Sequence, residues 1–141
     1  MSWLLDTCVV SEAMRKQPSS RVTGWLARQG DADLHLSALT LGELKKGVQR
    51  LPRSSRRAQL EHWLQHELCE RFEGRVLPID GRVALAWGTM QGDALARGEP
   101  LATVDSLIAA TALVHNLTVV TRNTADMART RVKIFDPWVV D

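Results

Sequence analysis

Four acidic side chains that are far apart in the sequence are the residues of this chain best suited to chemistry: Asp6, Glu43, Asp105 and Asp126. Carboxylates gathered in one cleft repel one another, so such a cluster is stable mainly when a cation lies among them. Oxygen ligands without His or Cys favour Mg²⁺ or Mn²⁺. A divalent ion held in this way activates a bound water and offsets charge on a phosphoryl group, which predicts phosphodiester hydrolysis.

Each of these acids also has an ordinary explanation when it is taken alone. Asp6 follows a short apolar run and is a good helix N-cap. Glu43 can pair with a lysine one turn further along its helix. Asp105 complements the dipole in the first turn of a helix, and Asp126 stands where a capping-box acid would. The chemical hypothesis therefore depends on the four acids meeting in the folded chain.

Polar and basic residues near the acids are secondary candidates. Thr7, Thr121 and Asn123 can orient water or phosphate by hydrogen bonds, although turn and cap chemistry explains such residues equally well. A basic cluster is either a solvated helix face or a phosphate-contacting patch for RNA. Its members are Lys45, Lys46, Arg50, Arg53, Arg56 and Arg57.

The histidines do not form a zinc motif. His62 and His66 are four residues apart on one expected helix face, but Trp63 stands where the zinc-protease motif requires Glu. His35 and His115 are isolated in the sequence. We interpret all four as surface or packing residues.

Size and composition indicate an ordinary globular protein with one domain over residues 1–141. The net charge of +2 decides little by itself. Cys8 and Cys69 lack metal-ligand spacing, and without an export signal they are expected to be reduced in a cytoplasmic protein. The longest mainly apolar run, residues 107–114, is too short to span a bilayer.

Strands are expected to alternate with helices along the chain. Apolar runs predict strands at residues 3–6, 34–37, 76–79, 118–121 and 132–135. Helical periodicity with breakers and caps predicts helices at residues 9–15, 19–29, 40–51, 54–72, 83–97 and 104–115, with a helical turn at 124–127. This alternation is typical of an α/β fold whose central, mainly parallel sheet is flanked by helices. Ligands then bind at the carboxyl ends of the strands, where Asp6 and Asp126 are expected.

Several segments resemble PIN-domain toxins of the VapC type, and most closely the FitB-like branch. The segments are WLLDTCVVSE (3–12), LSALTLGEL (36–44), RVLPID (75–80), DSLIAATA (105–112), VVTRNTAD (119–126) and FDPW (135–138). Their order and spacing cover nearly the whole chain. By this resemblance, the four acids fall on the acidic metal-binding positions of the family, and Thr121 and Asn123 on its polar support positions.

The resemblance also implies an activity and partners. It implies a Mg²⁺- or Mn²⁺-dependent endoribonuclease acting on structured RNA such as tRNA or rRNA. It further implies a homodimer and a cognate DNA-binding antitoxin of the VapB type, whose tail blocks the active site. One departure is Cys8, because the family usually has Asn there and Cys is a weak hydrogen-bond partner.

Two other interpretations stay open at this point. A haloacid-dehalogenase-like phosphatase also has a strand that ends in Asp, but it needs a second acid where this chain has Cys8. A catalytically weak PIN module would act through antitoxin binding and promoter regulation; Cys8 favours it mildly, and the intact acidic set argues against it.

Overall fold

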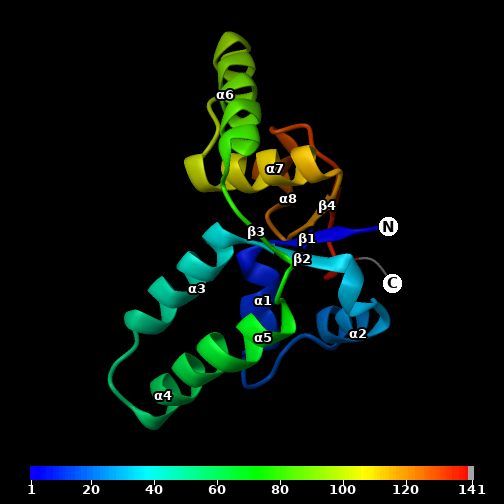
Figure 1. Ribbon diagram of the computed structural model, residues 1–141. Coiled ribbons are helices and arrows are strands. Elements are labelled where there is room, and N and C mark those ends of the chain that lie inside the picture. Colours follow the sequence, from blue (N-terminus) through cyan, green and yellow to red (C-terminus); the bar gives the residue numbers. More distant parts are fainter. Residues whose placement is uncertain (140–141) are drawn as a thin grey trace.

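The fold is organised around a five-stranded parallel sheet with strand order β3-β2-β1-β4-β5 (Figure 1). We describe residues 1–139 of a computed structural model. The chain passes from β1 through β2 to β3 on one side and then returns to place β4 against the other side of β1. This reversal of direction makes the carboxyl ends of β1 and β4 the switch point at which α/β proteins bind ligands.

All five predicted strands are present; β2 has the predicted bounds and the other four are shorter. They are β1 (Trp3–Leu5), β2 (Leu34–Ser37), β3 (Val76–Leu77), β4 (Thr118–Val120) and β5 (Ile134–Phe135). Leu5 is paired with Val120, so β1 and β4 end together and the residues after them meet. The edge strands β3 and β5 are the shortest, and each has a single neighbour to pair with. The prediction of a mainly parallel α/β fold is therefore confirmed.

Helices cover the sheet on both faces. They are α1 (Thr7–Ala13), α2 (Ser20–Arg28), a short 3-10 turn (Asp31–Asp33), α3 (Ala38–Gln49), α4 (Ser55–His62), α5 (Cys69–Arg71), α6 (Gly81–Ala96), α7 (Thr103–His115) and α8 (Thr124–Ala128). Three helices begin two residues earlier than predicted because a side chain at the end of a strand, or in the segment that follows it, caps them. Asp6 caps α1, Ser37 caps α3 and Asp80 caps α6.

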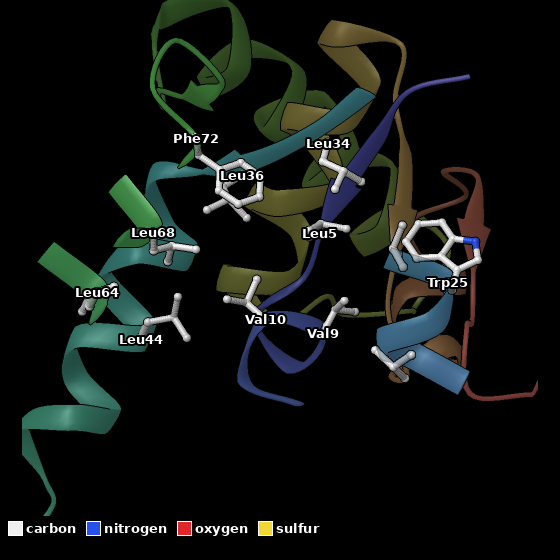
Figure 2. Close-up of a cluster of buried hydrophobic side chains, with 12 residues drawn as sticks. Leu5, Val9, Val10, Trp25, Leu34, Leu36, Leu44, Leu64, Leu68 and Phe72 are labelled. Carbon is white, nitrogen blue, oxygen red and sulfur yellow. The ribbon is translucent and has the colours of Figure 1, made fainter. Parts of the chain in front are cut away.

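The predicted long helix after Ser54 is interrupted by a different winding. Between α4 and α5 the backbone forms a π-helix, Trp63–Leu68, so the three segments make one helical rod. The sequence pattern did not predict this wider turn. Its apolar residues Leu64 and Leu68 are buried, and Figure 2 shows them packed beside Leu44 of α3. The π-helix thus keeps the apolar stripe of the rod facing α3.

The alternation of side chains along β1 divides the core in two. Leu5 joins the cluster formed with α1, α2, α3 and the π-helix, and ten of its twelve side chains are labelled in Figure 2. Leu4 joins the second cluster, which packs against α6 and α7 through Val83 and Ile108. Burial of the sheet on both faces explains why the strand sequences are largely apolar and do not alternate strictly with polar residues.

Two further expectations concern the cysteines and the membrane. Cys8 is half-buried and Cys69 is exposed, and neither forms a disulfide in the structure. Within residues 1–139, no helix is both long and apolar enough to cross a bilayer.

Candidate active site

Asp6 is the centre of the candidate site and is fixed through both carboxylate oxygens. It is 7 % exposed. Its backbone N–H donates to the Val120 carbonyl at 2.9 Å, which ties the end of β1 to β4. Its Oδ1 accepts from the Thr7 N–H at 2.8 Å, and its Oδ2 accepts from the Thr121 hydroxyl at 2.7 Å. Asp6 is therefore both the N-cap of α1 and an oriented carboxylate at the switch point.

Thr7 joins Asp6 to the second acid. Its hydroxyl donates to Glu43 Oε1 at 2.8 Å, across 36 residues of sequence. Glu43 lies on α3, which packs against α1, and its side chain is half-buried. Turn and cap chemistry was an equally good explanation of Thr7, and the structure shows both roles: its N–H donates to the Asp6 cap, and its hydroxyl donates to Glu43.

Thr121 and Asn123 connect Asp6 to the third acid. The Thr121 hydroxyl, which donates to Asp6, accepts from the Asn123 N–H at 2.9 Å. The Asn123 amide then donates to Asp105 Oδ2 at 3.3 Å. Asn123 occupies the N-cap position of α8 but makes no side-chain cap bond, so the expected capping role is wrong and its amide supports Asp105.

Asp126 completes the set from the first turn of α8, where it is exposed. It shares a pocket of about 130 Å³ with Asp105, and Arg129 lines the same pocket. Sequence reasoning missed Arg129. Its position three residues after Asp126, one helical turn further on, was the available signal.

The carboxylates act on one another electrostatically. Burial raises the pKa of Asp105 most, and the charges of Asp6, Asp126 and Glu43 raise it further. Burial also raises the pKa of Asp6, against the lowering effect of the hydrogen bonds from Thr121 and Thr7, and the charge of Glu43 adds to the rise. A cation bound among these carboxylates would offset their mutual repulsion and lower their pKa values.

The donor set suits a hard cation that keeps some of its water. Within residues 1–139, no three His, Cys, Asp or Glu side chains are arranged to hold a metal ion directly. Mg²⁺ commonly binds through one or two carboxylates and several waters, which the oxygen-only set around Asp6 and Asp105 can provide. Cys8 is the one soft donor nearby, with its Sγ 3.9 Å from Asp6 Oδ2. Burial raises the pKa of this thiol, which disfavours the thiolate that metals bind.

The basic cluster is divided in the structure. Arg56 donates to the Met14 carbonyl at 2.5 Å, and Arg57 donates to the Leu51 carbonyl while pairing with Glu61 at 2.9 Å. These two guanidinium groups therefore hold α4 in place. Lys45 is half-buried, and the exposed members of the cluster are Lys46, Arg50 and Arg53.

Comparisons with known proteins show the family to which the chain belongs. The PIN domain family model matches residues 3–133. Toxin FitB of Neisseria gonorrhoeae is 40% identical over 135 residues, which cover 96% of this chain and 97% of the relative. VapC ribonuclease Y4jK of Sinorhizobium fredii is 33% identical over 135 residues and covers 96% of each chain.

A solved structure shows the same likeness in three dimensions. The crystal structure of FitAcB from Neisseria gonorrhoeae superposes with a TM-score of 0.94 at 39% identity, covering 98% of this chain and 99% of the other. Together with the sequence matches, it shows that the chain belongs to the PIN-domain family and resembles the FitB and VapC toxins within it.

Proposed function

We propose that this chain is a Mg²⁺- or Mn²⁺-dependent endoribonuclease, the toxin of a type II toxin–antitoxin system. Its substrate is structured RNA such as tRNA or rRNA. The observation that carries the proposal is the chain of hydrogen bonds at the switch point that links Glu43, Asp6 and Asp105 through Thr7, Thr121 and Asn123. The name of the relative VapC ribonuclease Y4jK supports the same activity.

The side chains have separable roles in this reaction. Asp6 and Asp105 are the main metal ligands, and Glu43 and Asp126 complete the negative field through direct or water-mediated contacts. Thr7, Thr121 and Asn123 hold the acids through the hydrogen bonds described above. When bound, the metal supplies a water of lowered pKa and offsets charge on the phosphate. No protein nucleophile is required.

Substrate contacts follow from the distribution of positive charge. Arg129 lies in the pocket with Asp105 and Asp126, where a guanidinium can pair with a phosphate oxygen. The exposed Lys46, Arg50 and Arg53 lie on and just after α3, the helix that also carries Glu43. Contacts of this kind neutralise an RNA backbone without reading its sequence.

An RNA cleavage assay tests the proposal. Chain purified free of antitoxin is incubated with total RNA in Mg²⁺, in Mn²⁺ and in EDTA. The wild type should cleave only with metal, and Asp105→Asn should lose at least 100-fold in rate. Asp93→Asn, which changes an exposed acid on α6, is the matched control and should cleave like the wild type.

Thermal melts separate loss of the site from loss of the fold. Millimolar Mg²⁺ should raise the melting temperature of the wild type, because a ligand that binds only the native state stabilises it. Asp105→Asn should melt normally in EDTA and respond less to Mg²⁺. A fully active Asp105→Asn enzyme refutes the catalytic assignment. Stabilisation by metal without cleavage of RNA would instead favour the catalytically weak PIN module.

The proposed partners are a VapB-type DNA-binding antitoxin and a second copy of this chain. One protein in a solved structure of FitAB bound to a DNA fragment is 37% identical to this chain. This likeness supports the proposal of a DNA-binding antitoxin partner. The homodimer is supported by α6, whose residues Leu85, Gly88, Gly92 and Leu95 are exposed at alternating spacings of three and four. Such a stripe is the pattern of a helix seam, and a Cβ added at either glycine would meet nothing within 4 Å.

A further inference from the structure

Two exposed histidines on the α4–π-helix rod lie against each other. The ring centroids of His62 and His66 are 4.6 Å apart, with an angle of 35° between the ring planes. Both residues are exposed, and within residues 1–139 neither ring makes a hydrogen bond or an ion pair. The ring nitrogens are therefore available to a ligand from solvent.

The backbone sets this pair apart from two histidines that are merely near in sequence. His62 is the last residue of α4, and His66 lies inside the π-helix Trp63–Leu68. Wide π turns are rare and are found frequently at functional sites. Trp63, Leu64 and Leu68 of this turn pack into the core, which fixes the segment that carries the two rings. The histidines thus project from a braced backbone.

We propose that His62 and His66 form a binding site for a borderline divalent cation such as Ni²⁺, Cu²⁺ or Zn²⁺. Imidazole is a preferred ligand of these ions, and two histidines four residues apart on a helix can bind one ion from the same side. Metal–nitrogen bonds are about 2.0–2.1 Å long, so both ligating nitrogens must come within about 4 Å of each other. With ring centroids 4.6 Å apart, rotation about the side-chain torsions can bring one nitrogen of each ring to this separation.

The site is chemically and spatially distinct from the acidic centre. Its ligands are two nitrogens, with water completing the coordination, because no three metal-binding side chains are grouped within residues 1–139. Hard Mg²⁺ prefers oxygen and should not compete for it. The rod packs into one core cluster and α7 and α8, which carry Asp105 and Asp126, pack into the other, and Figure 1 shows α4 and α5 on the far side of the sheet from α7 and α8.

His62 also lines a groove between the end of α1 and the rod. Met14, Arg56 and Trp63 line the same groove, and Glu67 borders it. Within the rod, Cys69 is the one other soft donor near His66, and it is exposed one turn further along. The proposal assigns the ion to the two histidines and not to this thiol.

Isothermal titration calorimetry with Ni²⁺ tests the site in tag-free full-length chain, with excess Mg²⁺ present to occupy the acids. The wild type should bind one Ni²⁺ per chain. His62→Gln and His66→Gln should each weaken binding by at least tenfold, whereas His115→Gln and Cys69→Ser should bind like the wild type. Matching melts in EDTA confirm that all variants are folded.

Three results would overturn the inference. They are no Ni²⁺ binding by the wild type, unchanged affinity in either His62→Gln or His66→Gln, and loss of binding in Cys69→Ser. RNA cleavage plays no part in this readout, so the proposal stands or fails independently of the nuclease activity.

Discussion

Replacing threonine by valine at three buried positions should change the free energy of unfolding by a different amount at each position. Thr40, Thr111 and Thr121 are all fully buried, and each substitution exchanges a hydroxyl for a methyl group of similar volume. The differences must therefore come from the hydrogen bonds of each hydroxyl. Thr121 donates to the Asp6 carboxylate at 2.7 Å and accepts from the Asn123 N–H at 2.9 Å.

Thr121→Val should be the most destabilising of the three. A hydrogen bond to a charged group contributes about 1.5–3 kcal/mol, and here a buried carboxylate oxygen and an N–H both lose their partner. We expect a loss of about 2–3 kcal/mol in the free energy of unfolding. At about 3 °C per kcal/mol, this corresponds to a melting temperature lower by roughly 6–9 °C.

The other two positions supply the matched controls. The Thr111 hydroxyl donates at 2.8 Å to the Leu107 carbonyl within its own helix, a local bond whose loss costs at most about 1 kcal/mol. The Thr40 hydroxyl has no hydrogen-bond partner within the described residues. A buried hydroxyl without a partner costs about 1–3 kcal/mol, so Thr40→Val should stabilise the protein by about 1 kcal/mol.

Urea denaturation of the wild type and the three variants, at neutral pH and without metal, measures these differences. From most to least stable, the predicted order is Thr40→Val, wild type, Thr111→Val and Thr121→Val. Equal effects of Thr121→Val and Thr111→Val would refute the reasoning, because they would show that the bond to Asp6 contributes no more than a local helix bond. A destabilised Thr40→Val would show that this hydroxyl has a partner after all, such as a bound water.

Two further predictions concern Glu12 and α6. The hydrogen bond from the Ser19 N–H holds the pKa of Glu12 below its ordinary value. The ionised Glu12 side chain therefore stabilises the folded protein above about pH 4.5, and this stabilisation is lost as the pH falls through the pKa that Glu12 has in the folded state. Glu12→Gln should cost about 1 kcal/mol at pH 7 and less at pH 3.5. Glu99 is an exposed acid whose Oε2 lies 3.7 Å from Nε of the half-buried Arg97, and Glu99→Gln should cost almost nothing at either pH. A cost for Glu12→Gln that does not vary with pH would contradict this. The double substitution Leu85→Glu with Leu95→Glu should convert a dimer to a monomer in light-scattering measurements. Ala27→Glu on α2 is the control and should leave the dimer intact. A double variant that stays dimeric would exclude α6 as the interface.

The elements of the fold could be predicted because periodicity and breakers are local signals. Gly74 and Gly98 end their helices with φ of +78° and +72°, as their positions after helical runs indicated. The first residues of helices were less predictable, because several neighbouring residues can cap a helix and the sequence does not say which one does. In the structure, Asp6 caps α1 and Asp80 caps α6. The π-helix was not predicted, because Leu60, Leu64 and Leu68 have the spacing of an ordinary helix face.

The candidate site was predictable in its residue types but not in its connections. The four acids stand at expected places after strands and on helices, and the charges of the other three contribute to the raised pKa of Asp105. That Thr7 reaches Glu43, or that Asn123 supports Asp105, depends on contacts between segments distant in sequence. The same holds for Arg56 and Arg57, which sequence reasoning grouped with the phosphate-contacting residues and the fold uses to hold α4.

The unusual Cys8 shows why the orientation of Asp6 does not depend on one neighbour. Its thiol lies 3.6 Å from Thr121 Oγ1 and 3.9 Å from Asp6 Oδ2, and it accepts a weak bond from the Arg122 N–H at 3.5 Å. Both oxygens of Asp6 are nevertheless held by stronger donors, the Thr7 N–H and the Thr121 hydroxyl. Cys therefore fills the space between β1 and the β4–α8 loop, and the carboxylate keeps its position because the two strands end in register.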